Sequence, residues 1–166
     1  MGDSPADQYI SAGKTAYQNG NYREAALAFA AAGREFTLRG DALNAAEMAN
    51  NRSVALLQAK DPLGALQAVE GTEDIFALAG DTRRQAMALA NRGAALEALN
   101  RLEQAIEVYE QAAELFKEIG EFELRAPLMQ SLAALQLRTG RRLEGLVTMQ
   151  SGLQEIKQPG PRQSLL

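Results

Sequence analysis

Apolar residues recur at three- and four-residue intervals along most of this chain, a spacing typical of helices that bury one face. The clearest example lies in residues 101–119, where glutamates occupy the opposite face. A second such segment covers residues 22–38. Glycines separate these segments, so the pattern predicts helices joined by tight turns. The apolar stripe of residues 101–119 consists of Leu102, Ala105, Ile106, Tyr109, Ala113 and Phe116.

Residues that start or break helices predict eight of them. Ser4-Pro5 and Asp61-Pro62 each combine a capping side chain with a proline suited to the first helical turn. Gly71-Thr72 weakens the fourth helix, and Pro127 requires the seventh either to begin near Ala126 or to kink there. Six of the helices cover about residues 5–18, 22–38, 42–59, 62–78, 82–99 and 101–119; the seventh ends at residue 140, the eighth covers 141–156, and a tail follows.

The helices repeat in pairs with a period of 40 residues. Phe36, Phe76 and Phe116 are spaced by this period. A fixed period of this size indicates one supersecondary unit stacked on itself. Small residues recur where two helices of a pair must approach closely, and large ones recur to fill the neighbouring gap. The small positions are Gly13, Ser53, Gly93 and Ala133 in the first helices and Ala25, Ala65, Ala105 and Gly145 in the second; the large positions are Phe29, Val69, Tyr109 and Met149.

The composition excludes several kinds of active site but does not identify one. The 166 residues include no histidine and no cysteine, which removes Ser-His-Asp and Cys-His catalysis and ordinary zinc sites. The acidic residues fall at outward helical positions, where solvation explains them. Gly13-Lys14-Thr15 resembles the end of a phosphate-binding loop, but Gln8 stands where that loop needs a glycine, and the triplet lies inside a predicted helix. We therefore expect no enzyme and no cofactor.

Charge and hydropathy restrict the partners and the location. The net charge is −4, without a long block of one sign, which argues against nucleic acid as a partner. No run of about 18 apolar residues suggests a membrane span. The first residues carry neither a basic segment nor an apolar run, so no secretory signal is predicted. We expect a cytoplasmic protein that does not bind membranes.

The packing residues resemble those of tetratricopeptide-repeat proteins. Residues 20–25 (Gly-Asn-Tyr-Arg-Glu-Ala) with Phe29 and Ala32 match that family's pattern, and residues 91–96 with Tyr109 match it again. The 40-residue period resembles the long-helix variety found in kinesin light chains and bacterial regulatory proteins. The resemblance implies an all-α, right-handed superhelical stack of four antiparallel helix hairpins. We expect one domain over residues 1–157, with repeats at about 5–39, 41–79, 81–119 and 121–157, and a tail over 158–166.

The resemblance also implies a groove along the first helix of each pair, where such repeats bind peptides or proteins. Asn51 and Asn91 occupy a position that faces this groove in the family, and an amide both donates to and accepts from a peptide backbone. The alternative is that these asparagines bond to neighbours within the stack. The candidate groove residues are Lys14, Glu47, Asn50, Asn51, Met87, Asn91, Ala94, Gln130 and Arg138.

The sequence thus favours a non-catalytic module that binds a peptide or partner protein in its concave groove. One alternative is a self-assembling scaffold, because no polar capping helix follows the last helix. Repeat arrays usually need one, and Leu143, Leu146 and Val147 cannot all pack on the preceding pair. That assembly would be a homodimer through the last helix or the tail. A further alternative is a repeat domain of a larger sensor or regulatory protein.

Overall fold

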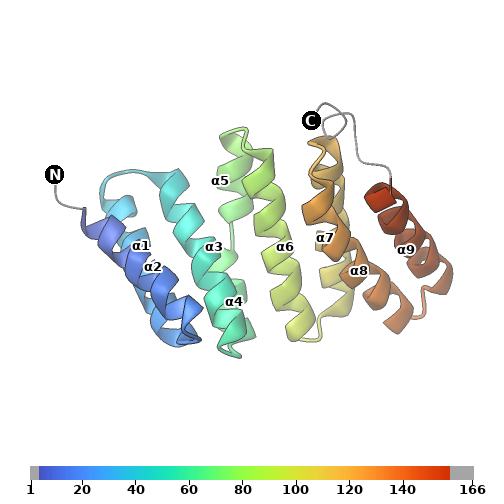
Figure 1. Cartoon of the computed structure of the whole chain (residues 1–166), viewed down its shortest axis with the longest axis horizontal. Coiled ribbons are helices and arrows are strands. Elements are labelled where there is room, and N and C mark those ends of the chain that lie inside the picture. The colour runs from blue at the N-terminus through green and yellow to red at the C-terminus, as the bar shows by residue number, and fades with distance from the viewer. Residues whose placement is uncertain (1–3, 158–166) are drawn as a thin grey trace.

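The computed structural model describes residues 4–157, and these form helices joined by short turns (Figure 1). Within that range no helix is both long enough and apolar enough to cross a membrane. The helices are α1 (Pro5–Gln18), α2 (Tyr22–Leu38), α3 (Ala42–Gln58), α4 (Pro62–Val69), α5 (Thr72–Leu78), α6 (Thr82–Ala98), α7 (Leu102–Glu118), α8 (Phe122–Arg138) and α9 (Arg142–Lys157).

The helices follow one another along the long axis from α1 to α9 (Figure 1). Each packs mainly on its neighbours in sequence, both within a hairpin, as α1 on α2, and between hairpins, as α2 on α3. The first helices of the hairpins, which are α1, α3, α6 and α8, lie toward the viewer. The predicted all-α stack of antiparallel hairpins is therefore confirmed in the described part of the chain. The predicted tail lies outside it.

The second hairpin departs from the sequence expectation. We expected one weakened helix over residues 62–78, but the structure has two, because α4 ends at Val69 and α5 begins at Thr72. Glu70 leaves the helical conformation with ψ 125°, and Gly71 has φ 77°. A positive φ costs glycine little because it has no Cβ. The chain therefore changes direction in the middle of what was expected to be the second helix of this hairpin.

Pro127 does not delay the start of its helix. α8 begins at Phe122, and Pro127 lies within it, so a start near Ala126 is excluded. Proline removes one backbone donor, which would have bonded to the carbonyl four residues earlier, on Glu123. The rest of α8 packs on α7 and α9, and this burial keeps the helix continuous through the proline.

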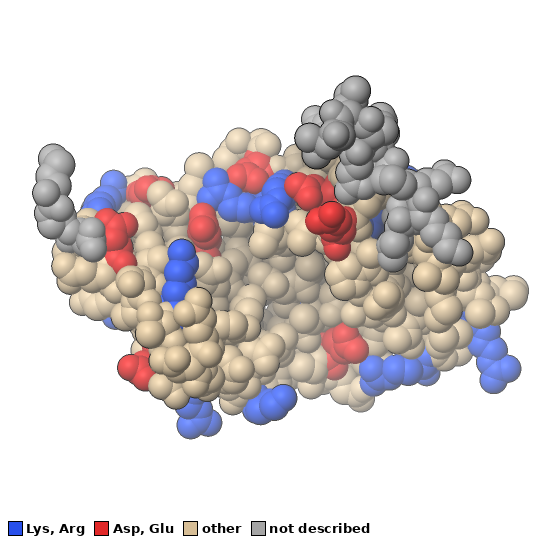
Figure 2. All heavy atoms as spheres, in the orientation of Figure 1, with Lys and Arg blue, Asp and Glu red and all other residues tan. Residues whose placement is uncertain are grey.

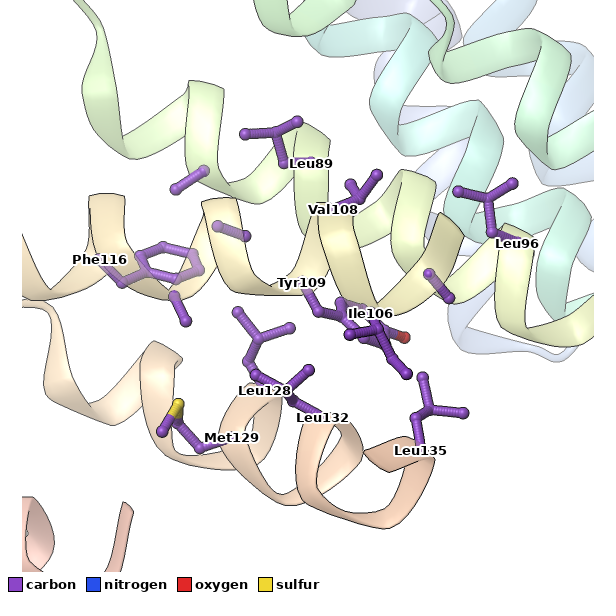
Figure 3. Close-up of a cluster of buried hydrophobic side chains, with 14 residues drawn as sticks. Leu89, Leu96, Ile106, Val108, Tyr109, Phe116, Leu128, Met129, Leu132 and Leu135 are labelled. Carbon is purple, nitrogen blue, oxygen red and sulfur yellow. The ribbon is translucent and has the colours of Figure 1, made fainter. Parts of the chain in front are cut away.

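Close contacts between a glycine and an aromatic ring join the two helices of the first and third hairpins. A Cβ built on Gly13 would lie 2.8 Å from Phe29, and one built on Gly93 would overlap the ring of Tyr109. Both aromatic rings are buried. In Figure 3, Leu128 and Leu132 of α8 point toward Tyr109 from the next hairpin. The fourth large position differs, because Met149 in α9 is exposed.

The outer face of α9 stays exposed, as the lack of a capping helix predicted. Leu143 is 80% exposed, and Leu146, Val147 and Leu153 are each more than half exposed. In earlier hairpins the second helix is covered by the first helix of the next hairpin. No described helix follows α9.

We expect Gly93→Ala to lower the free energy of unfolding by about 1–3 kcal/mol, because the added methyl group displaces Tyr109 from its packed position. Gly33→Ala is the matched control. A Cβ there makes an ordinary contact of 3.5 Å with Met48, so alanine should be neutral or stabilise α2 by up to about 1 kcal/mol. Urea denaturation followed by circular dichroism measures both. Equal effects would contradict the close-packing role of Gly93.

Candidate functional site

All of the predicted groove residues lie on the first helices of the hairpins, α1, α3, α6 and α8. Figure 2 shows the face that these helices form, with charged side chains along its upper and lower margins and a hollow of mostly uncharged atoms between them. The predicted residues differ in how far their polar atoms are already bonded within the protein. That difference decides which of them can reach a ligand.

Lys14 and Asn51 meet in one pocket. It has a volume of about 220 Å³ and lies between α1 and α3. Phe29 of α2, which is buried, is the innermost wall. Lys14 is exposed and has no hydrogen bond or ion pair with another described residue. The pocket is therefore apolar inside and carries an ammonium and an amide that are free to bind; its lining is Lys14, Tyr17, Gln18, Phe29, Asn51 and Val54.

Asn50 and Asn91 instead bond to each other inside the stack. The Asn91 side-chain amide donates to Asn50 Oδ1 at 3.2 Å. Asn50, only 8% exposed, donates to the Ala46 carbonyl at 3.2 Å and to the Thr72 hydroxyl at 3.3 Å. That hydroxyl in turn donates to the Val69 carbonyl at 2.8 Å. Bonding within the stack, the alternative that the sequence left open for Asn51 and Asn91, therefore describes Asn91. Asn50, which was expected to line the groove, is instead buried in the same chain of bonds, which ends at the break between α4 and α5.

Glu47 is also engaged between hairpins. The Arg84 guanidinium donates to Glu47 at 2.9 Å and to Asp81 at 2.6 Å. The same guanidinium lies over the ring of Phe76, 5.3 Å from its centroid. The backbone N–H and the guanidinium of Arg84 hold the pKa of the Asp81 carboxyl below its ordinary value. Asp81 also caps α6, so this arginine joins the start of α6 to α3.

The remaining candidates lie on α6 and α8. Met87 is exposed, and an Arg83 nitrogen lies 3.7 Å from its sulfur. Ala94 is half-buried, and Gln130 is exposed without a hydrogen bond to any other described residue. Arg138 forms an ion pair with Glu97 at 3.5 Å. Glu97 also accepts a bond from Tyr109, and burial together with this carboxylate raises the pKa of the Tyr109 phenol.

Three polar residues that the sequence did not single out as candidate site residues join neighbouring hairpins. Glu73 bonds to Arg92 at 2.6 Å, and its second carboxylate oxygen is buried without a hydrogen-bond partner. Buried Arg125 donates from Nε to the Ala113 carbonyl at 2.8 Å. Gln136, also buried, donates to the Glu110 carboxylate of α7 at 3.3 Å and, within its own hairpin, accepts a bond from Thr148 at 2.7 Å. The sequence holds a signal for the first of these contacts, because Arg92 directly follows Asn91 and a long arginine at such a position can pair with an acid of the neighbouring repeat.

Nothing in residues 4–157 suggests a metal site, because no three acidic side chains gather there closely enough to hold an ion. Lys14 lies within helix α1. The Gly13-Lys14-Thr15 triplet is therefore helical and does not form a phosphate-binding loop.

Comparison with known proteins supports the fold and indicates a family. The family model described as soluble NSF attachment protein matches residues 2–144. No curated protein matches the sequence. Similar solved structures include apo RapI (TM-score 0.83, 14% identity, 92% of this chain and 56% of that one). A second is aspartyl phosphate phosphatase F from Bacillus subtilis (TM-score 0.86, 12% identity, covering 97% of this chain and 43% of that one). A third is the set of TPR-like repeats of a putative kinesin light chain from Podosopora anserina (TM-score 0.79, 14% identity, covering 95% of this chain and 78% of that one).

These likenesses confirm the predicted tetratricopeptide-like solenoid. At identities of 12–14% they show the fold alone. The chain spans about half the length of the first two of these proteins.

We expect Asn91→Ala to lower the free energy of unfolding by about 1–2 kcal/mol, because it removes a donor from the buried oxygen of Asn50. Asn51→Ala serves as the control. Its amide has no hydrogen bond to a described residue, so the change should stay within about 0.5 kcal/mol. Urea titrations of the two variants measure both changes in the free energy of unfolding. A larger loss of stability for Asn51→Ala than for Asn91→Ala would contradict the assignment of the buried hydrogen bond.

Proposed function

The chain belongs to the soluble NSF attachment protein family, and on that premise we propose that it is a non-catalytic adaptor. It binds a peptide segment of a partner protein along the face of α1, α3, α6 and α8. The family's name describes attachment to another protein. The observation that carries the proposal is the pocket between α1 and α3, where free polar groups surround an apolar interior.

The pocket suits one apolar anchor residue of a peptide. Its volume of about 220 Å³ is below the usual range for whole small-molecule ligands, which is roughly 300–1,000 Å³. A side chain that enters it would contact Phe29, Tyr17 and Val54. Burial of such an anchor supplies most of the binding energy in peptide recognition.

The polar groups at the rim of this pocket would orient the bound peptide. The Asn51 amide can bond to a peptide N–H or C=O whatever the peptide's sequence. The Lys14 ammonium favours a carboxylate or a backbone carbonyl of the ligand. Met87 and Gln130 extend the accessible surface along the same face toward α8. The ligand is therefore a segment with an apolar anchor and an acidic group beside it.

We infer no catalytic activity. Without histidine or cysteine, the common nucleophile–base pairs cannot form. One similar structure is named a phosphatase, but at 12% identity that likeness concerns the fold. The cytoplasmic location expected from the sequence stays a prediction.

Peptides selected from a displayed random library would test the groove. We expect Lys14→Ala and Asn51→Ala each to weaken a selected peptide by roughly ten-fold, the effect of losing about one good hydrogen bond or ion pair. Lys117→Ala on α7 is the control and should leave affinity unchanged, because Lys117 is exposed and lies on a second helix, away from the pocket. Fluorescence anisotropy gives the constants. Selected peptides that bind all three variants as they bind the unmodified chain would rule the groove out.

A second function, self-assembly, is favoured by the exposed leucines of α9. Leu143, Leu146, Val147 and Leu153 all lie on α9 and are each more than half exposed. Monomeric proteins rarely leave large apolar patches uncovered. Pairing of two copies through α9 would bury these side chains in one two-fold interface.

We expect Leu143→Glu combined with Val147→Glu to abolish any dimer, because four carboxylates would then meet in the interface. Leu27→Glu with Leu78→Glu is the matched control. These leucines are also largely exposed (72% and 90%, against 80% for Leu143 and 64% for Val147) but lie on α2 and α5. Sedimentation velocity measures the mass of each protein. A monomeric unmodified chain at high concentration would dismiss self-assembly through α9.

A further inference from the structure

A second pocket lies among α4, α6 and α7, and its lining includes none of the predicted groove residues. Its volume is about 450 Å³, within the range of ligand-binding pockets. Leu66, Leu96 and Val108 line it with apolar surface, and the last two are buried. Nothing in the proposed peptide groove uses these residues.

The break between α4 and α5 shapes this pocket. α4 ends at Val69, and Glu70, which leaves the helix there, lines the pocket with Gln67 from the same short helix. Glu73, at the start of α5, holds Arg92 on the other side by an ion pair of 2.6 Å. An unbroken helix over residues 62–78 would place neither carboxylate where it now lies.

Helix α7 supplies the opposite wall as one continuous stripe. Gln104, Glu107, Val108 and Gln111 are spaced by three and four residues, so they share one helix face. Arg101 precedes this stripe at the start of α7. The wall thus offers two carboxamides beside one carboxylate and an apolar residue.

The charges of the rim favour a basic ligand. Glu70 and Glu107 have no ion pair with another described residue, and the only other charged group in the rim without such a pair is Arg101. Arg92 is already neutralised by Glu73, whose second oxygen is an unsatisfied buried acceptor. Glu110 and Glu118, which are exposed on α7 and have no ion pair with another described residue, add to the negative potential. A phosphate-bearing ligand would be repelled by these carboxylates.

We propose that this pocket binds a short basic segment of a partner protein, in which an aliphatic side chain is flanked by lysine or arginine. The aliphatic group packs on Leu96 and Val108. The basic groups pair with Glu70 and Glu107. The glutamine carboxamides of α4 and α7 bond to the segment's backbone, since each both donates and accepts. The adaptor would then hold two partners, one on each side of the stack.

The probes are two blocked octapeptides of equal length, one with two leucines and two lysines among glycines and serines, the other with glutamates in place of the lysines. Titration into the ¹⁵N-labelled chain is followed by NMR. We expect the lysine peptide to shift amide signals in residues 66–70 and 101–111 and to bind roughly ten-fold more tightly than the glutamate peptide, the effect of two exposed ion pairs. Equal binding of the two peptides, or shifts confined to other helices, would overturn the proposal.

Charge reversal gives the matched variants. Glu70→Lys combined with Glu107→Lys should abolish binding of the lysine peptide and strengthen binding of the glutamate peptide. Glu118→Lys, an exposed change on the same helix α7 outside the pocket, should leave both affinities unchanged. If Glu118→Lys weakens binding of the lysine peptide as much as the double change does, the attraction is a general effect of charge and the proposed site is refuted. Lys14→Ala should not alter these affinities, so this test and that of the groove fail independently.

Discussion

The stack depends on a close approach, seen in the first and third hairpins, between a glycine of the first helix and an aromatic ring of the second. Gly13 against Phe29 and Gly93 against Tyr109 leave no space for even one methyl group. This contact fixes the distance and the angle at which the two helices cross. That crossing also determines the shape of the face formed by the first helices, where the proposed peptide groove lies. The packing residues thus specify the repeat, and function depends on residues beside them.

Polar contacts between hairpins add a second level of order. Asn91, Asn50 and Thr72 form a chain of hydrogen bonds that runs from α6 through α3 to the start of α5. The ion pair of Arg92 with Glu73 holds the same end of α5. Since a buried polar group is costly unless it is bonded, these contacts fix where the interrupted helix of the second hairpin lies. The interruption then creates the pocket among α4, α6 and α7.

The two proposed sites follow from different properties of the same stack. The pocket between α1 and α3 joins an apolar interior to a free ammonium and a free amide, which suits an apolar anchor with an acidic neighbour. The pocket among α4, α6 and α7 combines three apolar side chains with two carboxylates that have no ion pair with another described residue, which suits an aliphatic residue with basic neighbours. An attachment protein with both would bring together two partners of opposite charge.

The sequence by itself determined the 40-residue period, the small and large positions and every helix except the interrupted one of the second hairpin, because these depend on the spacing and size of residues along the chain. It also placed Lys14 and Asn51 on the same face. Only the tertiary structure decided that Asn51 lies at an open pocket while Asn50 and Asn91 bond to each other, because the partner of each amide comes from a helix about 20 to 40 residues away. It likewise decided that α4 ends at Val69 and that Arg125 is buried against α7. Local periodicity states which face a residue occupies, whereas contacts across hairpins decide whether its polar atoms remain free.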